Sequence, residues 1–171
     1  MLHEQPTVVG HWRAVHYAGD WTAEQIAAGL APVALDENGQ PMIYEGENIL
    51  VNVGIQLLLD KLIGAAGTVF DNANAYIGIG DSNTAPAAGQ TDLQAASNKV
   101  RKAMDATFPS RSGQTMTWRC TFATSEGNFS IQEAGIFNAA AAGTMLNRLL
   151  AALGTKTSAT TLQVTATLTI S

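Results

Sequence analysis

Residues 115–123 read TMTWRCTFA, and this stretch decides the expected fold. Apolar and polar side chains alternate along it, and the apolar positions are Met116, Trp118, Cys120 and Phe122. Because successive side chains of a β-strand point to opposite faces, the alternation is typical of an antiparallel strand with one buried face. Cys120 is the single cysteine of the chain, so no intrachain disulfide is possible, and we expect it to be a small buried residue.

A second alternation lies at residues 161–171, which read TLQVTATLTIS. Its inward apolar positions are Leu162, Val164, Ala166, Leu168 and Ile170. Shorter strands are expected at 8–17, 76–79, 129–137 and 144–150, and also at 100–108, where a helix is the alternative. Several short strands at this spacing predict a mainly β chain folded as an antiparallel β-sandwich, jelly-roll-like in type.

Residues 48–63 carry the strong helical pattern of the chain. Their apolar positions fall on a single stripe, formed by Val51, Ile55, Leu58, Leu59 and Leu62. Asn48 is the expected N-cap and Gly64 the expected stop, while Gly54 inside the helix costs about 1 kcal/mol relative to alanine. The pattern predicts one helix that covers an end or a face of a sheet.

Residues 1–47 differ from the rest and are expected to form an N-terminal arm, with 48–171 as the helix and sandwich domain. A short helix is expected at 22–30, capped by Thr22, and a turn at 36–39. We expect the arm to dock on a neighbouring protein through aromatic and apolar side chains. These predicted interaction residues are Trp12, Tyr17, Trp21, Ile26 and Leu30. The alternative is that the segment completes the core of its own sandwich.

The composition narrows the kinds of molecule that the protein could bind. Charged residues make up 13% of the chain, against roughly 25% in an average domain. Either other proteins cover much of the surface, or the chain has a threonine-rich β surface that needs little charge. The net charge of −5 argues against a nucleic-acid partner, despite a local basic cluster at 99–119. No apolar run approaches the ~20 residues of a membrane span, so no membrane partner is expected.

Motifs that carry chemistry are not found in the sequence. His11 and His16 are five residues apart, a spacing that aligns on neither a helix nor a strand as a metal pair. Glu126 and Glu133 could be drawn as the two carboxylates of a glycosidase, but two glutamates seven residues apart prove nothing. We therefore expect a protein that is not an enzyme, with no catalytic residue, cofactor or metal.

Five segments resemble a group of small structural proteins from tailed bacteriophages and prophages. They are NILVNVG at 48–54, NAYIGIGD at 74–81, TDLQAASNKVRKAMDAT at 91–107, QEAGIFNAAAAGTMLNR at 132–148, and the tail 156–171. In the fourth segment we expect Asn138 and Gly143 to bracket a turn. Glu133 and Arg148 would then lie opposite each other across a hairpin, as an ion pair worth roughly 0.2–1 kcal/mol.

The resemblance implies a non-enzymatic structural protein of the virion, made in the host cytoplasm. A capsid decoration or cement protein fits best, with the major capsid protein as partner and self-association, expected as a trimer. A component of the tail, fibre or baseplate is one alternative. A module that binds host glycans by stacking on Trp12, Trp21 or Trp118 is another, and a depolymerase is a third.

Overall fold

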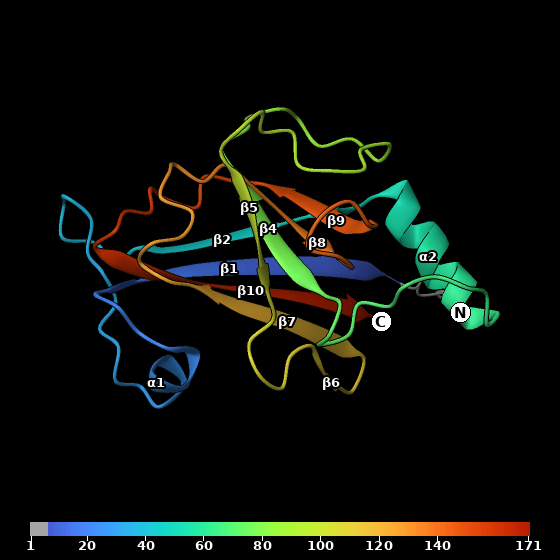
Figure 1. Cartoon of the computed structure of the whole chain (residues 1–171), viewed down its shortest axis with the longest axis horizontal. Coiled ribbons are helices and arrows are strands. Elements are labelled where there is room, and N and C mark those ends of the chain that lie inside the picture. The colour runs from blue at the N-terminus through green and yellow to red at the C-terminus, as the bar shows by residue number, and fades with distance from the viewer. Residues whose placement is uncertain (1–6) are drawn as a thin grey trace, which may run out of the picture.

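The computed structural model describes residues 7–171 and shows two antiparallel sheets of five strands each, packed as a sandwich (Figure 1). The first sheet has the order β2-β1-β10-β7-β6 and the second β3-β9-β8-β4-β5. The strands of the first sheet are β1 (Val8–Ala18), β2 (Ile43–Glu47), β6 (Ser110–Ser112), β7 (Thr115–Phe122) and β10 (Thr160–Ile170). Those of the second are β3 (Ile49–Leu50), β4 (Tyr76–Gly80), β5 (Lys99–Ala103), β8 (Glu133–Phe137) and β9 (Met145–Leu150). The two helices are α1 (Ala23–Ala27) and α2 (Asn52–Leu62). The predicted mainly β sandwich with a packed helix is confirmed.

The two alternating stretches of the sequence form neighbouring strands in the first sheet. β7 and β10 pair antiparallel, with Trp118 opposite Ala166 and Cys120 opposite Val164. All four side chains are buried, so a large and a small residue share each level of the core. Burial raises the pKa of the Cys120 thiol well above its ordinary range, which keeps the group protonated and inert.

The strand that begins the described chain lies inside the first sheet. β1 pairs with β10 along its whole length, from Val8 opposite Ile170 to Ala18 opposite Thr160, and pairs with β2 on its other side. Residues 7–47 thus belong to the sandwich, as the alternative expected, and residue 47 is not a domain boundary. The sequence did not predict this, because the alternation of apolar and polar residues in β1 is too weak to distinguish the strand from the irregular segments that follow it. Residues 1–6 of the expected arm lie outside the described residues.

The helix α2 begins later than expected and presents a different face to the sheet. It starts at Asn52, and its N-cap is Val51, whose aliphatic side chain cannot accept a capping hydrogen bond. Asn48 lies outside the helix, and its Oδ1 atom accepts a hydrogen bond from Trp12 Nε1 at 2.9 Å. The predicted cap is therefore wrong. The buried residues of the helix are Gly54 and Leu57, whereas Leu62 is 81% exposed.

Gly54 explains the orientation of the helix. A Cβ atom at this position would overlap the carbonyl oxygen of Leu146 and lie 2.7 Å from its Cα atom. The missing side chain lets the backbone of α2 rest directly on β9, and the apolar stripe read from the sequence is turned largely away from the sheet.

An ion pair between Glu133 and Arg148 forms as expected, but in the interior and not on the surface. In the hairpin of β8 and β9, Arg148 is opposite Gly135, so the two charged residues are diagonal neighbours. Arg148 Nη2 and Nε lie 2.7 and 2.9 Å from Glu133 Oε2. Both side chains are 0% exposed, so the stability of the pair depends on hydrogen bonds to every remaining polar atom.

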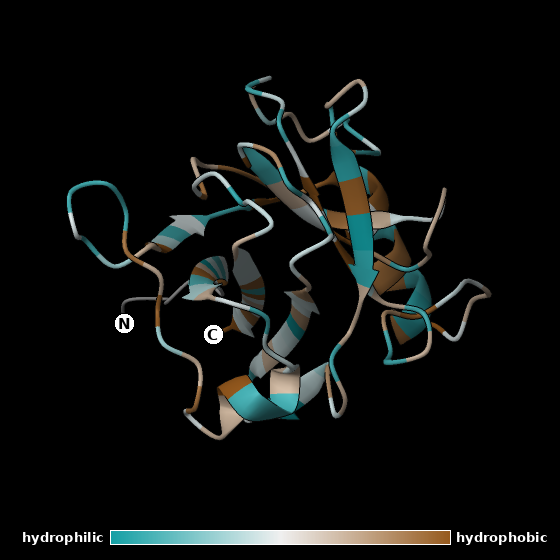
Figure 2. Ribbon diagram, turned by 60° about the vertical axis from the view of Figure 1, so that its left-hand side comes forward, coloured by the Kyte–Doolittle hydropathy of each residue, from teal (hydrophilic) through white to brown (hydrophobic). Residues whose placement is uncertain are grey.

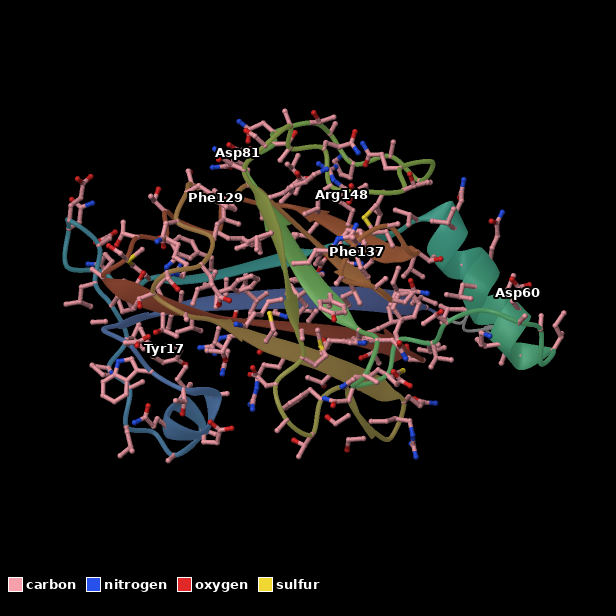
Figure 3. The ribbon with its side chains drawn as sticks, in the orientation of Figure 1. Tyr17, Asp60, Asp81, Phe129, Phe137 and Arg148 are labelled. Carbon is pink, nitrogen blue, oxygen red and sulfur yellow. The ribbon has the colours of Figure 1, made fainter. Side chains whose placement is uncertain are left out.

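Those hydrogen bonds come from the long loop 81–98, which contains no helix or strand. The Glu133 carboxylate accepts hydrogen bonds from the backbone N–H groups of Gln94 and Ala95, at 3.0 and 2.8 Å. Arg148 donates to the carbonyl oxygen of Thr84 at 2.8 Å and to the side chain of Gln90 at 3.1 Å. Figure 3 shows Arg148 beneath this loop, which arches over the second sheet.

The turn between β8 and β9 is bracketed by Asn138 and Gly143, as predicted. The side chain of Asn138 accepts a hydrogen bond from Thr144 N at 2.6 Å and donates one to the carbonyl of Thr68 at 2.7 Å. Gly143 has a φ of +72°, a left-handed conformation that favours glycine. The motif 132–148 therefore acts as a folding signature.

Gly54→Ala tests the close approach of α2. Helix propensity alone predicts that alanine stabilises the chain by about 1 kcal/mol. The contact with Leu146 predicts the opposite, a loss of about 1–3 kcal/mol in the free energy of unfolding, because the helix must move off β9. Urea denaturation measures this, with Gln56→Ala on the exposed side of α2 as the control. A stabilised Gly54→Ala variant would contradict the packing.

Arg148→Met leaves the Glu133 carboxylate buried without its counter-ion, so we expect a loss of about 3–5 kcal/mol in unfolding free energy. The control is Arg13→Met, which breaks an exposed pair with Glu45 (3.5 Å) and is expected to cost no more than about 1 kcal/mol. Adding Glu133→Gln to Arg148→Met should recover part of the lost unfolding free energy, since the unpaired charge is then gone. A double variant less stable than Arg148→Met would contradict this account.

Candidate functional site

The predicted interaction residues do not form one surface. Trp12 is 0% exposed, and Ile26 is the buried residue of α1, so both pack within their own chain. The prediction that Trp12 contacts a partner is therefore wrong. Trp21 is half-buried, and its Nε1 donates to the carbonyl of Ala18 at 2.6 Å. Tyr17 is half-buried as well, while Leu30 is 62% exposed.

The basic cluster at 99–119 is largely neutralised by acidic side chains. Lys99 and Arg101 lie 3.0 and 2.8 Å from Asp92. Lys102 lies 2.7 Å from Glu126, and Arg119 lies 3.2 Å from Asp105. Partial burial raises the pKa of Asp92, but hydrogen bonds from Lys99 and Arg101 outweigh this and hold it below its ordinary value. Figure 2 shows β5 as a mainly hydrophilic strand at the edge of the second sheet.

The two histidines of β1 face opposite ways. His11 is exposed, whereas His16 is 0% exposed and places Nε2 2.8 Å from the carbonyl oxygen of Leu153. Its other ring nitrogen, Nδ1, has no hydrogen-bond partner among residues 7–171. Burial lowers the pKa of His16, with a further contribution from the nearby charge of Lys156. Within the same residues no group of three or more potential metal ligands is found.

An apolar groove lies between α2 and the edge of the first sheet. It encloses about 330 Å³, and its walls come from α2, from the segment before β4, and from β7 and β10. Its apolar lining includes Leu57, Leu58, Val69, Phe70, Trp118 and Leu168. Only Lys61 and Asp71 bring charge to its rim, so the groove suits an apolar occupant.

Exposed aliphatic side chains also lie on α2 and in the segment that follows it. We call them the α2 patch: Ile55, Leu59, Leu62, Ile63 and Val69, which are between 39% and 81% exposed. The first three are spaced i, i+4 and i+7, so they share one side of the helix. Figure 1 shows α2 at one end of the sandwich. A cluster of this kind, unlike scattered single residues, marks a site of interaction.

Three residues of the α2 patch, Ile55, Leu59 and Leu62, belong to the helical stripe of the sequence, which we expected to face the sheet, whereas Ile63 and Val69 do not belong to it. The reversal follows from Gly54, whose close contact with β9 fixes the rotation of the helix. A glycine outside the stripe, Gly54, is the signal in the sequence that could have revealed this rotation.

The described part of the chain has no helix long and apolar enough to cross a membrane.

A second, more polar pocket of about 450 Å³ lies beside α1. Its lining includes Trp21, Asp20, Gln25, Asp105 and Thr121. Burial raises the pKa of Asp105, although hydrogen bonds from Thr121 and Arg119 oppose this. The pocket thus combines one indole ring with several hydrogen-bonding groups.

Comparison with known proteins gives no relative. No protein-family model, no curated protein and no solved structure matches the chain with significance. The function is therefore argued from the surfaces of this chain.

The buried His16 predicts that stability falls in weak acid. Because its folded-state pKa lies below 6.5, the unfolded chain binds more protons as the pH falls through 6.5. The contribution of His16 is complete above that pH and is lost towards the folded-state pKa. Urea midpoints at about pH 7.5 and about pH 5.5 measure the loss. In His16→Gln the loss should be smaller than in the wild type. An equal loss in His16→Gln and the wild type would contradict the assignment.

Proposed function

We propose that the protein is a non-enzymatic structural component of a tailed-phage particle, a capsid decoration protein that binds and stabilises the particle through protein contacts. The observation that carries the proposal is the α2 patch: five exposed aliphatic side chains on and after the helix at one end of the sandwich, one of which, Val69, also lines the apolar groove. Exposed aliphatic side chains that cluster in this way are typical of protein-binding sites.

The arrangement of the core supports a binding role. The motif 132–148, which carries the resemblance to phage structural proteins, builds β8, β9 and the buried ion pair. The carboxylates that could have been drawn as a catalytic pair are both engaged: Glu133 with Arg148 and Glu126 with Lys102. These groups stabilise the sandwich on which the α2 patch is presented.

A host glycan-binding module is a second candidate, favoured by the pocket beside α1. Trp21 supplies an indole ring there, and Asp20, Gln25 and Asp105 supply hydrogen-bonding groups. Sugars are commonly held by such a combination of stacking and polar contacts. Of the three tryptophans considered for this role, Trp12 and Trp118 are buried, which leaves Trp21.

Co-sedimentation separates the two candidates. The full chain is mixed with empty capsids, with isolated tails and with host envelope fragments. We expect saturable binding to capsids, which Leu62→Asp weakens at least tenfold, because burial of a leucine is worth roughly 1.5–3 kcal/mol and 1.4 kcal/mol is a factor of ten.

The matched control is Leu35→Asp, at a 62% exposed leucine on another part of the molecule. It should bind capsids as the wild type does. Binding to tails alone would place the protein in the tail. Binding to envelope fragments that Trp21→Ala abolishes would favour the glycan module, and binding to none of the three would overturn the proposal.

A further inference from the structure

We propose that residues 151–159, the connector between β9 and β10, form an acid-sensitive switch: the connector closes over the neutral ring of His16 and opens locally when that ring takes up a proton. The inference goes beyond the proposed function and does not depend on it, because the α2 patch lies on another part of the molecule. Figure 3 labels Asp60 on α2 at one end, and Phe129, whose carbonyl oxygen accepts a hydrogen bond from the connector, in the half away from it.

The hydrogen bond of His16 fixes where its proton lies. His16 shares the inward face of β1 with Trp12 and Ala14 and is buried. Its Nε2 atom lies 2.8 Å from the carbonyl oxygen of Leu153 in the connector. A carbonyl oxygen can only accept, so Nε2 carries the proton of the neutral ring and Nδ1 carries the lone pair. One hydrogen bond from the neutral ring therefore joins the connector to β1.

A second proton on the His16 ring has no acceptor in the closed state. The Nδ1 atom is buried and has no hydrogen-bond partner among residues 7–171. An N–H group formed there would give up its hydrogen bonds to water without a replacement. From β2 the ring meets Tyr44, edge to face at 5.7 Å between ring centroids, and this side chain brings no carboxylate. The closed connector therefore accommodates the neutral ring and disfavours the protonated one.

The charged side chain that acts on His16 is Lys156, a cation that the connector itself carries. Lys156 is 1% exposed, and its Nζ donates a hydrogen bond to Oδ1 of the neutral Asn128 at 3.0 Å. The carboxylates of Glu126 and Asp20 attract Lys156, whereas His16 forms no ion pair among residues 7–171. A protonated His16 would therefore be a second buried cation close to the first, which the interior disfavours.

The connector can open while the two sheets stay folded. It contains no helix or strand, and three hydrogen bonds attach it to the segment 129–131. They run from Leu153 N to Ile131 O at 2.9 Å, from Ile131 N to Gly154 O at 2.9 Å, and from Lys156 N to Phe129 O at 3.1 Å. None of these bonds belongs to the ladders that pair β7 with β10 or β8 with β9. Segments attached in this way open at a lower free energy than the strands of a core.

A close contact with Tyr44 sets the closed position of the connector. Gly154 has a φ of +82°, and a Cβ atom there would lie 2.6 Å from Cε2 of the Tyr44 ring. The same ring contacts His16, so it touches both the connector and the group that titrates. Leu153 and Ile131 are fully buried in the closed state. Opening brings these two side chains into contact with water, so weak acid uncovers an apolar surface at this part of the sandwich.

Hydrogen exchange of the full chain tests the switch at the amides of Leu153, Ile131 and Lys156. Burial and the charge of Lys156 hold the pKa of His16 below 6.5 in the closed state, although the hydrogen bond to Leu153 opposes this. In the open state the pKa is ordinary, so the closed state loses stability as the pH falls through 6.5. Between about pH 7.5 and about pH 5.5 the protection factors should fall about three- to tenfold. Their dependence on urea should be shallow, because local opening exposes little surface.

Three variants show which group is responsible. His16→Gln keeps a donor for the Leu153 carbonyl but takes up no proton, so the fall should be absent. Lys156→Met removes the neighbouring cation and should make the fall smaller. Gly154→Ala should lower protection at both pH values, because its Cβ atom meets Tyr44, and so shows how an open connector exchanges. Far-UV circular dichroism at about pH 7.5 checks that each variant is folded.

Nitrogen NMR of the wild-type ring tests the same geometry without a substitution. At about pH 7.5 we expect the proton of His16 on Nε2 and none on Nδ1. A proton on Nδ1, unchanged protection in the wild type, or an equal fall in His16→Gln would each overturn the inference. So would a urea dependence as steep as that of the amides between β7 and β10, since the opening would then be global unfolding.

Discussion

The buried ion pair between Glu133 and Arg148 is the interaction on which the second sheet depends. Two full charges with no access to water are tolerated because a 2.7 Å contact joins them and backbone groups of Thr84, Gln94 and Ala95 occupy other polar atoms. A loop without regular structure is thereby made part of the core. The loop 81–98 and the hairpin of β8 and β9 depend on each other, since each supplies hydrogen-bonding groups that the other needs.

Much of the sandwich could be predicted because its strands carry local information. Apolar and polar residues alternate in the sequences of β7 and β10, and both strands lie where the alternation predicts, although the polar residues Thr121, Thr161 and Gln163 are buried as well. The rotation of α2 could not be predicted, because it is set by the contact of Gly54 with Leu146, a residue 92 positions away in the chain. Helical periodicity identifies an apolar stripe but does not state which element, if any, covers it.

Only part of the candidate site could be predicted from the sequence, because the sequence shows the local helical pattern but not the distant contacts of the helix. Leu62 and Leu59 were recognised as apolar positions of a helix, and their exposure became clear only with the fold. Conversely, the aromatic Trp12 suggested an interface, yet the hydrogen bond to Asn48 and complete burial make it a core residue. An aromatic side chain in a weakly patterned segment fits either role, and pairing with a distant strand decides between them.

The pairing of β1 with β10 has a consequence for the order of events during synthesis. β1 can pair with β10 only after residues 160–170 have left the ribosome, and these form the last of the described strands to be synthesised. Until then one face and one edge of β1 have no partner, and its apolar side chains remain available for misassociation. The second sheet, whose strands β4, β5, β8 and β9 lie between residues 76 and 150, is complete enough to collapse earlier. We therefore expect closure of the first sheet to come late in folding, since it joins distant parts of the chain.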